Sequence, residues 1–311
     1  MKRIFRIAAI AAVALIAVGA LAFAGAIGLG DRKRERDVDI RVVPVPYVKD
    51  AAALKLGKYL FESRGCGECH GDDGRGIVFI DAPNGMYVKS PDITRGKGGV
   101  VSDYNEGDWV RTIRHGVNPK GHALLAMPSG DYNRMTDADF AALVAYVRAL
   151  SPVAGEGAVI RLPKAVRALY GIGVIKDAAE RIDHRKPPSQ PVAAAATIDH
   201  GAYVANMCTG CHGPALSGGK VSGTPPDWLP AANLTPGEGS VMPRYDTAEK
   251  FVAMMRTARR PDGSEVSNVM PFMSLRNLND TDLNAAYAYL KTLAPRRVTG
   301  SDSRATRAEQ R

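Results

Sequence analysis

The stretches "RGCGECHGDDGRG" at Arg64–Gly76 and "MCTGCHG" at Met207–Gly213 decide how the rest of this sequence is interpreted. In each stretch two cysteines stand three positions apart, and a histidine directly follows the second cysteine. The two stretches hold all four cysteines of the chain, which are Cys66, Cys69, Cys208 and Cys211. A CxxC pair can bind zinc, act as a redox dithiol or anchor a haem, and each use makes different demands on the surrounding sequence.

The histidine after each cysteine pair favours covalent haem attachment, because C-x-x-C-H is the pattern of c-type haem sites. The two thiols form thioethers with the haem vinyl groups, and the adjacent imidazole binds the iron from one face. We therefore expect two haems, attached by Cys66, Cys69, Cys208 and Cys211. The expected proximal iron ligands are His70 and His212. Four thioethers would leave no thiol for a disulfide or for a cysteinate ligand.

Zinc and dithiol chemistry explain less of the sequence. A four-cysteine zinc site would join two knuckles that lie 139 residues apart, and it would leave both following histidines without a role. A thioredoxin-like dithiol expects a βαβ context, which the sequence does not show.

An internal repeat extends the two motifs into two modules. Met127–Pro152 aligns without a gap with Met270–Pro295, and nine of the 26 aligned positions are identical. The first motif begins 61 positions before Met127 and the second begins 62 positions before Met270. The repeat predicts two domains of similar construction.

A methionine is the expected distal iron ligand in each module. A thioether sulfur gives a low-spin iron and raises its reduction potential. Met127 and Met270 occupy equivalent repeat positions, and each precedes a proline that stiffens its loop. In the first module His115 or His122 is the alternative, through bis-histidine ligation. The second module has no histidine after His212.

Several other methionines and histidines are not the expected iron ligands. Met242 is a rival ligand in the second module, but the first module has no matching Met-Pro. Met135 aligns with Leu278, which favours a place in the core. His184 and His200 lie in or near the linker, where we expect solvated side chains.

The N-terminus predicts a membrane segment. Lys2, Arg3 and Arg6 precede an uncharged run over 7–30, which is long enough to span about 30 Å of hydrocarbon. The positive flank keeps the N-terminus in the cytoplasm. We expect a single-pass anchor in the inner (cytoplasmic) membrane with the haem domains in the periplasm. The alternative is a signal cleaved at the small-residue site Ala22–Ala24, which leaves a soluble periplasmic protein.

Hydrophobic periodicity and capping residues predict an all-α fold, with two tandem domains behind the membrane helix. Helices are expected over 50–63, 106–115, 136–150 and 197–206. The expected segments are an anchor over 1–30, a spacer over 31–49, domain 1 over 50–152, a linker over 153–192 with a possible helix over 163–183, domain 2 over 193–297, and a disordered tail over 298–311.

The composition argues against nucleic acid as a partner and favours a large bound cofactor. The net charge is +9, but Lys and Arg often alternate with Asp and Glu, and no aromatic-interleaved basic stripe suggests nucleic-acid binding. Aromatic residues make up only 6% of the chain, so a large apolar cofactor would help to fill the small cores.

The two CxxCH motifs and the Met-Pro…Asp-x-Asp…Ala-Tyr segments resemble class I c-type cytochromes over about residues 50–296. More narrowly, "PDIT" at 91–94, "ANLT" at 232–235 and "DHGAYVANMCTGCHG" at 199–213 resemble the cytochrome c subunits of membrane-bound alcohol and sugar-acid dehydrogenases. That group usually carries three haem modules, and this chain has two.

The resemblance implies further roles. Gly57 and Gly201 would let the first and last helices of each domain cross closely, with Tyr146 and Tyr289 on the other side. The indole N–H groups of Trp109 and Trp228 are candidates to hold a haem propionate.

The expected function is electron transfer without bond chemistry. Two haems would form an electron-transfer path. The electrons would pass from a membrane-associated or periplasmic donor, such as a dehydrogenase subunit, to a respiratory acceptor such as a terminal oxidase. The alternative is a dihaem enzyme such as a peroxidase, which needs one open or switchable iron and acid–base groups beside it.

Overall fold

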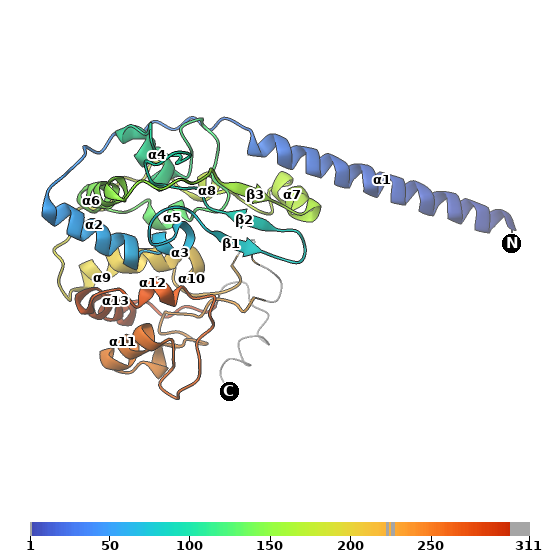
Figure 1. Cartoon of the computed structure of the whole chain (residues 1–311). Coiled ribbons are helices and arrows are strands. Elements are labelled where there is room, and N and C mark those ends of the chain that lie inside the picture. The colour runs from blue at the N-terminus through green and yellow to red at the C-terminus, as the bar shows by residue number, and fades with distance from the viewer. Residues whose placement is uncertain (1, 222–223, 225–227, 299–311) are drawn as a thin grey trace.

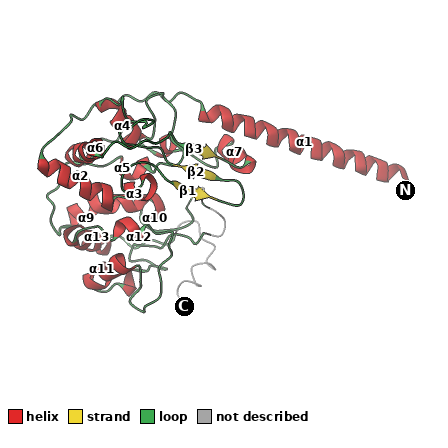
Figure 2. Ribbon diagram, viewed as in Figure 1, coloured by secondary structure: helices red, strands yellow, loops and turns green. Residues whose placement is uncertain are grey.

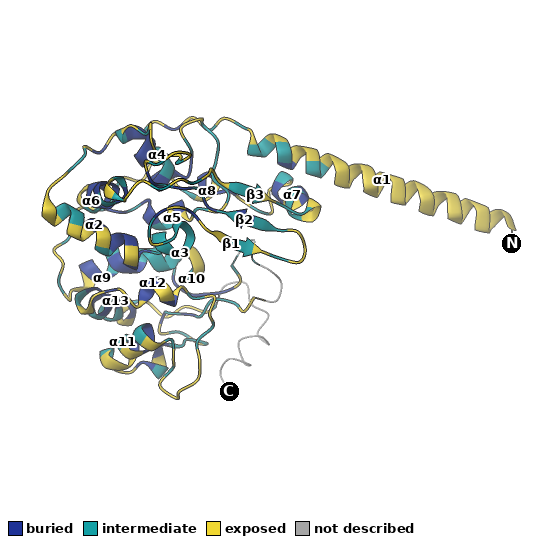
Figure 3. Ribbon diagram, in the orientation of Figure 1, coloured by how far each residue is buried: buried dark blue, intermediate teal, exposed yellow. Residues whose placement is uncertain are grey.

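The structure, a computed structural model, describes residues 2–221, 224 and 228–298. The long helix α1 (Lys2–Arg34) projects from a body of two helical domains (Figure 1). Most of its surface is exposed, whereas the body carries the buried residues (Figure 3). The expected disordered tail lies, from residue 299 onward, outside the described residues.

The other elements of the described chain follow the repeat (Figure 2). The first domain contains α2 (Ala51–Ser63), α3 (Cys66–His70), β1 (Val78–Asp81), β2 (Tyr87–Lys89), α4 (Glu106–His115), α5 (Ser129–Tyr132) and α6 (Asp137–Ala149). The connecting segment contains β3 (Val159–Arg161), α7 (Lys164–Gly171) and α8 (Ala178–Arg181). The second domain contains α9 (Ile198–Ala205), η1 (Asn206–Cys208), α10 (Thr209–His212), η2 (Met242–Arg244), α11 (Ala248–Thr257), α12 (Phe272–Leu275) and α13 (Asp280–Thr292).

A small sheet corrects the all-α expectation. Strands β1, β2 and β3 form an antiparallel sheet in that order, and Tyr87 on β2 pairs with Arg161 on β3. The Lys89 ammonium donates to the Glu156 carboxylate at 2.7 Å and reinforces the β2–β3 edge. Part of the expected linker is therefore a strand packed on the first domain, and the fold is mostly helical.

The spacer and the linker helix also differ from expectation. Residues 35–49 are extended, but they lie against the first domain, where Ile40 and Val45 are buried. The backbone N–H of Tyr47 donates to the Glu106 carboxylate at 3.0 Å. The possible single helix over 163–183 is two short helices, α7 and α8, because Gly173 adopts a positive φ of 80° between them.

The main helices begin at residues whose side chains cap them. The Thr136 hydroxyl accepts a hydrogen bond from the Asp139 backbone N–H at 3.1 Å at the start of α6. Asn105 and Asp108 form a reciprocal capping box at the start of α4. Gly116, with φ 66°, ends α4 as the glycine signal predicts.

Two glycines set the close helix crossings that shape each domain. A Cβ atom on Gly57 would lie 2.0 Å from the Ala142 carbonyl oxygen, where α2 crosses α6. A Cβ atom on Gly201 would lie 2.0 Å from the Ala285 carbonyl oxygen, where α9 crosses α13. Two repeat-equivalent tyrosines lie at these crossings on the facing helices, with their Cβ atoms 2.7 Å from the added Cβ: Tyr146 and Tyr289. The close crossings implied by the resemblance are confirmed.

The two domains exchange the same contact across their interface. The Tyr59 hydroxyl of the first domain donates to the Asp282 carboxylate of the second at 2.7 Å. The Tyr203 hydroxyl of the second domain donates to the Asp139 carboxylate of the first at 2.5 Å. Each hydroxyl also accepts a hydrogen bond from the backbone N–H at the cap of the facing helix. This reciprocity is the mark of a pseudo-two-fold interface.

Asp282 gathers more partners than Asp139. Its carboxylate accepts from the Arg64 guanidinium at 2.9 Å and from Nε2 of His200 at 2.7 Å. Burial acts to raise the pKa of Asp282, but Arg64, Tyr59 and His200 together hold it below its ordinary value. The expectation that His200 is solvated is wrong, because this carboxylate holds it in the interface at 5% exposure.

We predict that Gly57→Ala and Gly201→Ala each destabilise the chain. An alanine gains about 1 kcal/mol in helix propensity, but overpacking a tight contact costs roughly 1–3 kcal/mol, and at 2.0 Å the backbones must separate. Denaturant unfolding of the full chain measures the difference. Gly157→Ala is the control, because its nearest neighbour would lie 4.0 Å away. Equal midpoints for all three variants would contradict the close-crossing account.

Replacing Asp282 by Asn should weaken the interface far more than replacing Asp139 by Asn. Removing one member of a buried ion pair costs roughly 3–5 kcal/mol, whereas Asp139 has a neutral tyrosine partner, whose hydrogen bond is worth about 1 kcal/mol. The pKa of Asp282 is depressed, so its stabilisation is present above about pH 4 and is lost as pH falls through the folded-state value.

Unfolding of wild type and Asp282→Asn at pH 7 and at pH 3 tests both statements. The gap in unfolding free energy between the two proteins should be large at pH 7 and should shrink in acid. A gap that is constant with pH would show that the carboxylate charge contributes nothing.

Candidate functional site

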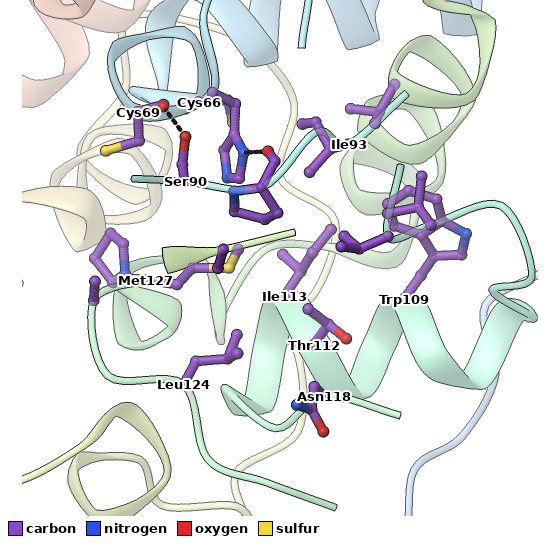
Figure 4. A pocket seen from close by; sticks show the side chains of 18 of the residues that line it. Cys66, Cys69, Ser90, Ile93, Trp109, Thr112, Ile113, Asn118, Leu124 and Met127 are labelled. Atoms are coloured by element: carbon purple, nitrogen blue, oxygen red, sulfur yellow. Dashed lines mark hydrogen bonds between the residues drawn. The ribbon is translucent and has the colours of Figure 1, made fainter. Parts of the chain in front are cut away.

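The first domain encloses a cavity of about 660 Å³ beside its CxxCH turn. Cys66, Cys69 and His70 line one side, and Met127 lines the opposite side (Figure 4). Helix α4 closes a third side with Trp109 and other side chains, and the lining is mainly apolar. A flat, largely apolar group that is attached at the turn could be held here with its iron between a histidine and a methionine.

Backbone carbonyls orient both motif histidines. Nδ1 of His70 donates to the Pro91 carbonyl at 3.1 Å, and Nδ1 of His212 donates to the Ala232 carbonyl at 2.8 Å. A carbonyl only accepts, so the proton lies on Nδ1 and the Nε2 lone pair is left for a metal. Histidines that bind metals are typically oriented in this way.

These carbonyls belong to the "PDIT" and "ANLT" segments, which now have a structural role. Asp92 in the first segment and Asn233 in the second are buried. Each side chain accepts a hydrogen bond from the threonine two residues later, at 2.7 Å to Thr94 N and 2.9 Å to Thr235 N. The tight turns fix the direction of the carbonyl that receives each histidine.

Burial keeps the two histidines neutral. It lowers the pKa of His70 and of His212, and the carbonyl hydrogen bond opposes this only in part. Neutral imidazole is the form that binds a metal. Burial also raises the pKa of the Cys66 and Cys208 thiols to about 12. Redox-active dithiols need a lowered thiol pKa, so the dithiol alternative has no support here.

The zinc alternative also lacks support. Among the described residues, which include all four cysteines, no group of three or more His, Cys, Asp or Glu side chains is arranged to hold a metal ion. None of the four cysteines is paired in a disulfide.

The expected distal methionines occupy partly buried positions. Met127 lines the cavity, and Met270 packs at the edge of the second core. The prolines that follow them begin the short helices α5 and α12. The rival Met242 is 2% exposed within the second core, a place that suits packing. Met135 is also buried, which confirms its expected core role.

The alternative histidine ligands lie elsewhere. In the described part of the chain, neither His115 nor His122 lines the cavity. Nε2 of His184 donates to the Ala179 carbonyl at 2.9 Å, so Nδ1 of His184 accepts a hydrogen bond from Nδ1 of His115 at 2.9 Å. Burial, with adjacent His184 and Arg114, lowers the pKa of His115 to about 4. The expectation that His184 is solvated is therefore wrong.

Trp109 provides a test of fit for a haem. Its indole N–H is buried and has no hydrogen-bond partner among the described residues, and the ring lines the cavity. Buried polar groups normally have partners, so this donor fits an acidic group on a molecule that fills the cavity. A haem propionate is such a group. Trp228 differs, because it is 41% exposed.

Each CxxCH turn packs against the Met-Pro helix of the other domain. The Glu68 carboxylate on α3 accepts a hydrogen bond from the Ser274 backbone N–H on α12 at 2.7 Å. The Asp131 carboxylate on α5 accepts a hydrogen bond from the Gly210 backbone N–H on α10. In the aligned repeat, Glu68 corresponds to Gly210 and Asp131 corresponds to Ser274. The acidic residue therefore lies on the CxxCH turn in one contact and on the Met-Pro helix in the other. Sequence reasoning missed these residues, although the exchange is visible in the aligned repeat.

Comparison with known proteins identifies the family. The family model described as cytochrome c matches residues 54–151 and 199–294. The chain belongs to the cytochrome c family. Membership implies covalently bound haem c, and each matched region contains one CxxCH motif. The expected resemblance is thereby confirmed.

Several curated cytochromes are similar over much of the chain. The "Fructose dehydrogenase cytochrome subunit" of Gluconobacter japonicus is 26% identical over 83% of this chain and 56% of its own length. The "Gluconate 2-dehydrogenase cytochrome c subunit" of Pantoea cypripedii is 28% identical over 78% of this chain and 60% of its own length. The "Alcohol dehydrogenase (quinone), cytochrome c subunit" of Gluconacetobacter polyoxogenes is 34% identical over 32% of this chain and 22% of its own length. This cytochrome thus spans somewhat more than half the length of the first two.

The interface carboxyl of Asp131 should make stability depend on pH near neutrality. Burial raises its pKa to about 7, whereas an unfolded aspartate titrates near pH 4. Between these values the folded state binds more protons, so stability falls as pH rises. Asp131→Asn keeps an acceptor for Gly210 and removes the titration. Its unfolding free energy should therefore rise relative to wild type between pH 5 and pH 8, and parallel pH profiles would contradict this.

Proposed function

We propose that this cytochrome is a dihaem electron carrier with histidine–methionine ligation at both irons. The observation that carries the proposal is the first cavity, where the CxxCH turn presents a carbonyl-oriented His70 on one side and Met127 lies on the other. The second domain repeats the motif, the histidine–carbonyl hydrogen bond and the Met-Pro helix. Two haem sites follow from two complete sets of residues.

Haem c supplies an iron that takes up and gives up one electron. The protein supplies the attachment, the ligands and the surroundings. Cys66, Cys69, Cys208 and Cys211 form the thioether links, and the ligand pairs are His70 with Met127 and His212 with Met270. The apolar lining of the first cavity excludes water and disfavours the more highly charged oxidised iron, which raises the reduction potential. The Trp109 indole N–H would neutralise part of a propionate charge.

The interface supports electron transfer between the two sites. Each attachment turn rests on the Met-Pro helix of the other domain, through the contacts of Glu68 with Ser274 and of Asp131 with Gly210. The paired tyrosine–aspartate contacts hold the domains in one arrangement. Such a shared interface keeps two attached groups at a fixed separation, as a two-step electron path requires.

The proposed setting is the periplasmic side of the inner membrane, with α1 as an uncleaved anchor. An 18-residue apolar stretch of the helix has a mean hydropathy of 2.7 and is exposed. The relatives named as dehydrogenase subunits favour a membrane-bound dehydrogenase as electron donor. A terminal oxidase or another respiratory complex would be the acceptor. The peroxidase alternative needs acid–base groups beside an open iron, but neither His115 nor His122 lines the first cavity, and His115 is hydrogen-bonded to His184.

Met127→Ala and Met270→Ala should each remove half of the weak near-infrared sulfur–iron band of the oxidised protein. Each should also lower the reduction potential of one haem, because a weaker field ligand replaces the thioether. Met135→Leu is the matched control, since this buried methionine packs in the core. Full band intensity in either alanine variant would show that the assigned methionine is not the ligand.

A redox titration of the full chain, followed by absorbance, tests the carrier function. We expect two reversible one-electron steps, low-spin spectra in both oxidation states, and no turnover of hydrogen peroxide with a small reductant. A high-spin ferric component together with peroxide turnover would overturn the carrier proposal in favour of a haem enzyme.

A further inference from the structure

Helix α7 is packed tightly against the C-terminal end of the membrane helix α1 (Figure 1). A Cβ atom on Gly30 would lie 2.2 Å from the Arg167 carbonyl oxygen, and one on Gly171 would lie 2.2 Å from the Ala26 carbonyl oxygen. Small residues at such a crossing let two backbones touch. The two helices therefore form one unit.

Hydrogen bonds and ion pairs also stabilise the crossing of α1 and α7. Nε of Arg167 donates to the Asp31 carboxylate at 2.9 Å. The Lys33 ammonium donates to the Tyr170 carbonyl at 3.1 Å and pairs with Glu180 at 2.9 Å. The position of α7 relative to α1 is thus fixed by backbone contact and by charge.

The depth of α7 follows from the sequence of α1. A span of about 20 residues crosses the hydrocarbon core. Counted from Arg6, the last charge at the cytoplasmic end, this span ends near Ala26. Ala26 is where Gly171 contacts α1. Helix α7 therefore lies at the outer boundary between acyl chains and headgroups.

The exposed surface of this region matches that boundary. Three large apolar side chains at the end of α7 and in the following turn are exposed: Leu169 at 38%, Ile172 at 59% and Val174 at 56%. Lys164 and Lys176, which flank these side chains in the sequence, and Arg32 at the end of α1 are also exposed. Apolar side chains with adjacent cations are typical of segments that lie in the membrane interface, where anionic lipids attract the cations.

We propose that α7 and the turn over 172–174 form a second, interfacial membrane contact, in which Ile172, Val174 and Leu169 enter the outer leaflet. The occupant of this apolar surface is lipid, because the surface is continuous with the lipid-facing surface of α1. The contact fixes which face of the first domain is turned to the bilayer, since β3, which lines the haem cavity through Ile160, ends three residues before α7. The inference rests on the proposal that α1 is an uncleaved anchor.

Tryptophan scanning with brominated lipid tests this contact. The full chain is reconstituted in vesicles of phosphatidylethanolamine and phosphatidylglycerol, with or without bromine distributed along the acyl chains. Ile172→Trp is the test variant. Ile16→Trp reports on the anchor, and Ile198→Trp on α9 is the matched control, at 50% exposure in the second domain. The fluorescence ratio between the two lipids, for each variant, removes the constant quenching by haem.

The expected result is strong bromine quenching for Ile172→Trp and none beyond the unsubstituted chain for Ile198→Trp. Quenching of Ile16→Trp alone would overturn the interfacial contact while leaving the anchor intact, and would point to a protein partner for this surface. No quenching of either Ile16→Trp or Ile172→Trp would overturn both the anchor and the contact. Equal quenching of Ile172→Trp and Ile198→Trp would overturn the assignment to α7.

Discussion

The structure depends on support for the CxxCH turn from outside the turn. A helix of five residues such as α3 has too few internal hydrogen bonds to be stable alone, yet it must present two thiols and an imidazole to one side. The support comes from three directions. Helix α2 leads into the turn, Ser90 donates to the Cys69 carbonyl and Pro91 accepts from His70, and the Ser274 backbone N–H donates to Glu68 from the other domain.

The third direction explains why the two domains form one unit. Each CxxCH turn makes a hydrogen bond with the Met-Pro helix of the other domain, so the position of each turn depends on both domains. The contacts Tyr59–Asp282 and Tyr203–Asp139 are equivalent in the repeat, so the interface between the two domains is symmetric at this point. Arg64 and His200 add contacts to the Asp282 half alone. The inequality gives the two sites different electrostatic surroundings on an otherwise repeated frame.

The sequence correctly predicted the features that depend on residues close together in the chain. The capping residue Thr136 and the glycine that ends α4 act on neighbouring residues of the chain, and the structure confirms the helix ends that they set. The glycine crossings were predicted through the resemblance to class I c-type cytochromes, which gives Gly57 and Gly201 their role. The cavity could not be predicted, since its walls come from segments nearly a hundred residues apart.

The sheet and the buried histidines were missed for a related reason. Strands of three or four residues carry almost no periodic signal, and β3 pairs with β2 across about seventy residues. His184 lies in the predicted linker and His200 lies just after it, so solvated side chains were expected. Only the folded contacts with Asp282 and His115 show that they are held in place. The ligation of the two irons stays a prediction, because the same methionines would also suit an apolar pocket.

The central claim is that both CxxCH turns carry covalent haem. The most direct test is the mass of the full chain after unfolding in acid, which removes haem held by ligation alone and leaves thioether-linked haem attached. The account predicts a single species heavier than the polypeptide by two haems. A species carrying one haem would show that one turn is not an attachment site, and a bare polypeptide mass would contradict the account entirely.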